Sequence, residues 1–209
     1  DDEEWSRLSD ACEDMANRKL FVYDSGYVNI HQIRTQMRKL KSAHPEITLC
    51  VIDYIGLMMA TSNFSDRHLQ IAEISRGLKL LARELDMPII ALSQLNRSLE
   101  SRANKRPMLS DLRESGAIEQ DADMILFVYR DEVYREQEEK EAEKKAHAEG
   151  KEYVRKFVPN KIEEDAEIIV GKNRNGPVGT VEVIFQKEFT RFVDKSFGAA
   201  HVAEFNPNA

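Results

Sequence analysis

Two polar side chains, Asp53 and Gln94, lie close behind short, mainly apolar runs of residues. The runs cover residues 47–52 and 89–92, and both are predicted to be strands buried on both faces of a parallel sheet. In open α/β sheets, ligands bind at the carboxyl ends of such strands. There a carboxylate can hold Mg²⁺ against nucleotide phosphates, and an amide can sense a phosphate or orient water. The structural alternatives are a turn formed by the Asp and a surface hydrogen bond made by the Gln.

Two cations, Lys172 and Arg174, stand two residues apart, which places them on the same side of a strand. Residues 176–179 read GPVG and predict a turn that presents the pair at a sheet edge. One interpretation is an arginine finger, a cation supplied to the nucleotide of another subunit, where phosphoryl charge develops. The alternative is a solvated turn that favours solubility.

A basic loop over residues 97–106 leads into the sequence DLRESG at residues 111–116. Arg113 offers a cation, backbone amides at a helix start attract phosphate, and Gly116 lets a phosphate backbone approach closely. This segment is therefore a candidate for binding a phosphate backbone. The alternative is a capped helix whose charges are solvated.

One phosphate-binding pattern is missing from these residues. The sequence contains no G-x-x-x-x-G-K-[ST], because Gly171 and Lys172 are followed by Asn173. Without that loop and its lysine, these residues by themselves cannot form a complete P-loop NTPase site.

The periodicity of apolar residues predicts the elements that must position these groups. Spacings of three and four predict helices over residues 1–18, 30–40 and 71–85, the second with Asn29 as its N-cap. Residues 110–123 predict one or two short helices.

Short apolar or alternating runs predict strands. They cover residues 20–23, 47–53, 89–92, 124–129, 167–172, 180–187 and 189–193. Strands that alternate with helices and then follow one another predict an α/β fold, a mostly parallel sheet flanked by helices with antiparallel C-terminal strands.

The chain has 209 residues and 42% of them are hydrophobic, enough apolar material for one domain of ordinary size. No apolar run reaches the roughly 18–20 residues of a membrane span, so no membrane partner is expected. The sequence starts with DDEE, shows no export signal and lacks an initiating Met, so we expect a fragment or a processed product. Cys50 is predicted to be a buried free thiol, which suits a reducing cytoplasm.

The net charge of −7 is unevenly distributed. Residues 131–167 contain 13 acids and 8 bases, so one segment carries most of the acidity. The net charge does not exclude a nucleic-acid partner, because binding depends on where the cations lie. Residues 136–156 are predicted to be a solvated helix within a charged insertion at about residues 132–165.

Taken together, these segments resemble the C-terminal motor domain of bacterial replicative DNA helicases of the DnaB type. The resemblance covers nearly all of residues 1–209, and its most specific part is the run from Lys105 to Asp123. The other matching segments are DDEEW at 1–5, VIDY at 51–54, EISR at 73–76, ALSQLNR at 91–97 and KNRNGPVG at 172–179.

The resemblance implies a RecA-like fold that acts in a homohexameric ring around single-stranded DNA and moves 5′ to 3′ with ATP and Mg²⁺. By matching positions, Asp53 is the Walker B carboxylate and Mg²⁺ ligand, and Gln94 is the phosphate sensor. Lys172 and Arg174 then reach the nucleotide of the neighbouring subunit.

The resemblance also implies that Arg113, Glu114 and Gly116 lie on a pore loop that contacts DNA phosphates. It places the family's P-loop, the catalytic glutamate after it and the primase-binding domain upstream of Asp1. Primase and a helicase loader or initiator are the implied partners of the full-length protein, and the replisome at the nucleoid is its implied location.

Two alternatives remain open from the residues. One is a RecA-type recombinase or a circadian-type ATPase with the same core, which the run over residues 113–123 disfavours. The other is a non-catalytic module that binds DNA or a partner protein. A P-loop upstream of Asp1 would identify the full-length protein as an ATPase.

Overall fold

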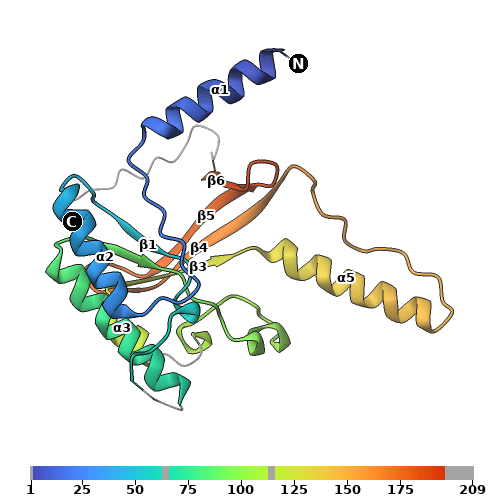
Figure 1. The fold of residues 1–209 in the computed structure, drawn as a ribbon. Helices are drawn as coiled ribbons and strands as arrows, with labels where there is room; N and C mark the ends of the chain where they lie inside the picture. Colours follow the sequence, from blue (N-terminus) through green and yellow to red (C-terminus); the bar gives the residue numbers. More distant parts are fainter. Residues whose placement is uncertain (1, 63–65, 113–115, 196–209) are drawn as a thin grey trace. The chain divides into compact units, whose positions relative to one another are not determined.

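The computed structural model describes residues 2–62, 66–112 and 116–195. They belong to two compact units, Asp1–Ser93 and Gln94–Ala209 (Figure 1). The first unit contains a parallel pair of strands, and the second contains a four-stranded antiparallel sheet.

The core of the first unit lies between two helices and the strand pair. Its elements are α1 (Asp2–Asn17), α2 (Ile30–Ala43), β1 (Cys50–Ile52), the 3₁₀ turn η1 (Ile55–Leu57), α3 (Arg67–Glu84) and β2 (Ile89–Ala91). Ile74 and Leu81 of α3 are fully buried, as its apolar stripe predicts. Gly77 lets α2 approach α3 closely, because a Cβ atom at this position would collide with the side chain of Ile30.

The prediction that Asn29 caps the second helix is confirmed. Its Oδ1 atom accepts hydrogen bonds from the amides of His31 and Gln32, both at 3.0 Å. The Gln32 side chain accepts in return from the Asn29 amide at 2.9 Å, which completes a capping box. This local exchange satisfies amides that have no partner inside the helix.

Two strand predictions in the first unit need correction. The predicted strand at residues 20–23 is wrong, because this segment pairs with no described strand and Val22 is 81% exposed. β1 spans three residues and is not buried on both faces, since Val51 is 57% exposed and its ladder partner Ile90 is 50% exposed. Nothing in the described part of this unit covers that face. Cys50 is accordingly half-buried rather than buried, and burial raises the pKa of its thiol.

The second unit is built on the sheet β3–β4–β5–β6, in which all neighbours are antiparallel. Its elements are the 3₁₀ turns η2 (Arg97–Ser101) and η3 (Leu109–Asp111), α4 (Gly116–Asp121), β3 (Met124–Tyr129), α5 (Asp131–Ala148), β4 (Glu163–Asn173), β5 (Gly179–Gln186) and β6 (Arg191–Asp194). The predicted β4–β5 hairpin and the final strand are confirmed, and so are two short helices within about residues 110–123, of which the second begins at Gly116.

β3 is half-buried, although the sequence predicts a buried strand. Ile125 and Phe127 pack with Leu112 in the core, whereas Leu126 and Val128 on the other face are 52% and 53% exposed. The reason is its antiparallel pairing with β4, because a sheet of this kind can be covered on one face only.

Residues 131–162, here called the charged arm, consist of α5 and an extended segment that returns along it (Figure 1). The predicted helix over 136–156 therefore ends at Ala148. The Tyr153 hydroxyl donates to Glu139 at 2.8 Å, and Arg155 pairs with Glu143 at 2.7 Å. At the base of the arm, the buried Glu164 pairs with Arg130 and, at 3.5 Å, with Lys187. Polar contacts thus hold the arm together.

The α/β prediction is confirmed in its broad form. The parallel part is smaller than predicted, because among the described strands only β1 and β2 form a parallel ladder. No described helix is long and apolar enough to cross a membrane.

Candidate functional site

Asp53 is the first residue after β1, at the carboxyl end of the parallel pair. The backbone around it is fixed on both sides, because the Leu92 amide donates to the Ile52 carbonyl at 2.9 Å and the Ile55 amide donates to the Leu92 carbonyl at 3.0 Å. The Asp53 side chain is exposed and has no hydrogen-bond or ion-pair partner among the described residues. A carboxylate held in place and left unpaired is suited to binding a cation.

No group of three or more His, Cys, Asp or Glu side chains that could hold a metal ion occurs among the described residues. Asp53 alone still fits Mg²⁺, which keeps several waters and is usually bound through one or two carboxylates together with substrate phosphates. Asp53 could thus supply one ligand of such an ion, whereas the described residues do not form a closed metal cage around it.

Gln94 is exposed and begins the second unit, three residues after the end of β2. Its side chain makes no hydrogen bond within the described part of the chain. Asp53 belongs to the first unit, so these two predicted site residues lie in different units.

Lys172 and Arg174 lie at the end of β4, and the structure brings both to the carboxyl end of α4. Lys172 Nζ donates to the carbonyls of Glu119 and, at 2.7 Å, Ala122. Arg174 donates from Nη2 to the Gln120 carbonyl at 2.9 Å and pairs through Nη1 with Asp123 Oδ1 at 3.1 Å. The sequence reveals the two cations but not these partners, which are about 50 residues away in the chain.

A β-bulge at Gly171 precedes the pair. Ile125 pairs with Lys172 and Leu126 pairs with Val170, so Gly171 has no ladder partner. A Cβ atom at Gly171 would lie 2.5 Å from Cε2 of Phe127, so glycine is needed for the close approach of the two strands. Bulges of this kind redirect the side chains that follow them.

Of the predicted DNA-contacting residues, Arg113 and Glu114 lie outside the described residues. Gly116 is the exposed first residue of α4, with no atom near the place that a Cβ atom would take. The structure thus describes the residues before and after this segment, up to Leu112 and from Gly116 onward.

The preceding flank contains a buried carboxylate, Asp111, that the sequence does not reveal as important. Its Oδ2 atom pairs with Arg102 at 2.7 Å and accepts from the Met108 amide at 2.9 Å. Its carbonyl accepts from the Asn96 amide at 2.8 Å. Asp111 therefore ties η3 to the segment that follows Gln94. Its position three residues after Met108, at a helix start, is the one local sequence signal for this role.

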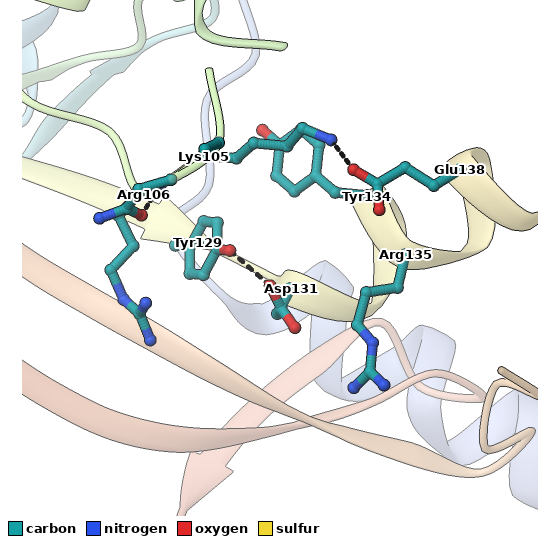
Figure 2. Close-up of a pocket in the computed structure, with 9 residues that line it drawn as sticks. Lys105, Arg106, Tyr129, Asp131, Tyr134, Arg135 and Glu138 are labelled. Carbon is teal, nitrogen blue, oxygen red and sulfur yellow. Dashed lines mark hydrogen bonds and ion pairs between the residues drawn. The ribbon is translucent and has the colours of Figure 1, made fainter. Parts of the chain in front are cut away.

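The basic loop is less free than the sequence suggests. Lys105 and Arg106 line a pocket of about 310 Å³ together with the first turns of α5 (Figure 2). Lys105 pairs with Glu138, and Arg106 pairs with both carboxylate oxygens of Glu167, at 2.5 and 2.9 Å. The carboxylate of Glu167 raises the pKa of Arg106. Both ion pairs anchor the loop, so neither cation is a free phosphate ligand.

Two tyrosines form the wall of this pocket on β3 and α5. The rings of Tyr129 and Tyr134 stack with centroids 5.8 Å apart, and the Tyr129 hydroxyl donates to Asp131 at 2.6 Å. Burial and the carboxylate of Asp131 raise the pKa of the Tyr129 hydroxyl, which stays protonated. The pocket thus lies where the basic loop meets the charged arm, and the charged groups named here are paired with one another.

Comparison with known proteins identifies the family. The family described as DnaB-like helicase C terminal domain matches residues 1–194. Replicative DNA helicase DnaB of Helicobacter pylori is 50% identical over 206 residues, which cover 93% of this chain and 42% of the relative. The corresponding protein of Pasteurella multocida is 44% identical over 193 residues, covering 92% of this chain and 37% of the relative. The chain thus spans about two-fifths of the length of these relatives.

Solved structures agree with this result. One is described as an ATPase domain, and it matches with a TM-score of 0.77 and 39% identity over 93% of this chain and 61% of its own. Another is described as a DnaB-like replicative helicase and its interactions with primase, and it matches equally well over 41% of its own chain. The chain belongs to the family of DnaB-like helicases, as the sequence resemblance predicts.

Proposed function

We propose that this chain is the larger part of the motor domain of a replicative DNA helicase with a RecA-like fold. The observation that carries the proposal is the match of residues 1–194 to the helicase family, with relatives up to 50% identical. The full-length protein hydrolyses ATP with Mg²⁺, forms a hexameric ring around single-stranded DNA and moves 5′ to 3′ at the replication fork of the nucleoid. The described fragment does not hydrolyse ATP by itself, because its sequence contains no P-loop.

Four residues of this chain serve the nucleotide. Asp53 holds Mg²⁺, which supplies charge neutralisation at the phosphates when bound. Gln94 contacts the terminal phosphate or the attacking water of the same subunit. Lys172 and Arg174 reach across the subunit interface and stabilise the negative charge that develops on the transferred phosphoryl group. The exposure of Asp53, Gln94 and Arg174 is consistent with these roles.

Residues 113–116 contact the DNA backbone. Arg113 supplies a cation, Glu114 belongs to the same loop, and Gly116 begins α4, where open space around its Cα atom admits a close ligand. Such contacts recognise charge and spacing and not base edges, so binding is tolerant of sequence. Primase and a loader or initiator protein are the proposed protein partners; a primase interaction is described for one structural relative.

The test uses the full-length protein and its Asp53→Asn variant. The unaltered protein should hydrolyse ATP, increase that rate with single-stranded DNA and unwind substrates that carry a 5′ tail. The variant should still bind single strands and elute as the same oligomer, but it should lose hydrolysis. Unwinding without ATP, or full hydrolysis by the variant, would contradict the proposal.

A further inference from the structure

The carboxyl end of α4 is where the two predicted finger cations meet the segment after the DNA loop. The last carbonyls of any helix lack partners inside the helix and need donors from elsewhere. At α4 these donors are the side chains of Lys172 and Arg174, which bind the carbonyls of Glu119, Gln120 and Ala122. A hydrogen-bonded link therefore joins β4 to the helix that begins at Gly116.

Asp123 adds two contacts to Arg174. Its carbonyl accepts from the Arg174 amide at 2.8 Å, and its carboxylate pairs with Nη1 at 3.1 Å. Together with the Gln120 carbonyl, these contacts fix both the backbone and the guanidinium of Arg174. The side chains of Arg174 and Asp123 remain about half exposed, at 48% and 53%.

The number of donors separates the two cations. A guanidinium has five N–H donors in a rigid fork, and the contacts to Asp123 and Gln120 account for two of them. Three donors of Arg174 thus have no partner among the described residues. An ammonium has three donors, and two of those on Lys172 bind carbonyls. Arg174 can therefore stay anchored while it binds phosphoryl oxygens, whereas Lys172 mainly closes the end of α4.

We propose that Asp123 is a positioning residue for Arg174. The inference rests on the proposed finger role of Arg174. A guanidinium that is already oriented loses less side-chain entropy when it meets the phosphoryl group, so its contribution to the rate is larger.

The experiment compares Asp123→Asn with the unaltered full-length protein. The substitution keeps the shape of the side chain and removes its charge. We expect kcat for ATP hydrolysis to fall about three- to tenfold, with KM for ATP within about twofold. Glu119→Gln is the matched control, because it removes a carboxylate four residues before Asp123, on α4, and that carboxylate pairs with no described cation. This control should keep the parental values.

A double-mutant comparison separates positioning from a structural role. In an Arg174→Lys background, which keeps a cation but not the two-pronged contact, Asp123→Asn should change kcat by less than about twofold. A merely structural Asp123 would lower the melting temperature and reduce kcat equally in both backgrounds. If Asp123→Asn proves poorly folded, Asp123→Ser is measured in the same two backgrounds with the same expected difference.

Failure of the positioning role of Asp123 and failure of the finger role of Arg174 give different results. A parental kcat in a folded Asp123→Asn protein would overturn the positioning role while leaving the finger intact. A parental rate in Arg174→Ala would overturn the finger and with it the basis of the inference.

Discussion

Asp53 and the Lys172–Arg174 pair are both predicted to act on a nucleotide, but their side chains differ in whether they have partners in the structure. The carboxylate of Asp53 is anchored through its backbone and has no side-chain partner among the described residues. The two cations bind carbonyls and a carboxylate of their own unit. An unpaired surface carboxylate is well hydrated and costs little. The carbonyls at the end of α4, in contrast, need donors.

The difference predicts how each residue responds to substitution. A group without internal partners can be replaced without loss of stability, so any loss of activity reports its chemistry. When a group that also supplies donors to a helix end is replaced, the protein loses stability as well as the chemical contribution of that group. Arg174 is intermediate, because two of its donors bind groups of its own unit and three are spare.

The largest effect is expected for Arg174→Ala in the full-length protein. Loss of an arginine finger lowers the hydrolysis rate by roughly 10³–10⁵, while nucleotide binding should persist because the finger acts on the neighbouring subunit. Steady-state hydrolysis and nucleotide binding measure the two properties. Arg191→Ala is the control, since Arg191 is also an exposed cation of this sheet and binds the Gln186 side chain.

A mixing experiment tests whether this finger acts across the interface. Arg174→Ala subunits are combined with subunits inactivated at the P-loop, so that some interfaces contain one intact copy of each part. Those interfaces should regain hydrolysis. A mixture as inactive as its components would show that Arg174 acts within its own subunit or not at all.

A smaller effect is expected for DNA binding by Arg113→Ala. Single-strand affinity should fall several-fold, and the slope of log affinity against log salt should become shallower by about 0.7, because one phosphate contact fewer releases fewer counterions. Basal hydrolysis without DNA should change much less. Titration of labelled oligonucleotides at several salt concentrations gives the slope, and an unchanged affinity and slope would place Arg113 outside the DNA path.

The smallest effect concerns stability and tests the comparison directly. Lys172→Ala leaves the Glu119 and Ala122 carbonyls without this donor and should cost about 1 kcal/mol, or roughly 2–4 °C in melting temperature. Asp53→Asn should change the melting temperature by less than about 1 °C, because no described side chain depends on this carboxylate. Equal shifts in melting temperature in the two variants would mean that Lys172 contributes no more to stability than Asp53 does.

The correct predictions rest on signals that are local in the chain. Asn29 caps α2 with residues two and three positions away, and residues 174–178 form the β4–β5 turn because the strands on both sides are close in sequence. The strand predicted at residues 20–23 failed for the opposite reason. Its composition suits a strand, but a strand forms only with a partner, and Val22 lies exposed without one among the described strands.

The charged arm shows the same limit. The composition of residues 136–156 correctly indicates a solvated helix as far as Ala148, because its Glu, Lys and Ala residues favour a helix and offer no apolar face. The end of that helix at Ala148 and the return of residues 149–162 along it depend on single contacts such as Tyr153 to Glu139. Composition does not specify such contacts.

The sequence by itself determined the family of this protein, its α/β content and the identity of Asp53, Gln94, Lys172 and Arg174 as candidates, because residue types and short spacings carry that information. Only the tertiary structure decided that Asp53 has no partner among the described residues, that β1 and β3 are covered on one face, and that Arg174 is held by Asp123 and Gln120. The physical reason is that burial and hydrogen-bond partners are set by residues about 50 positions apart in the chain that meet only when the sheet has formed.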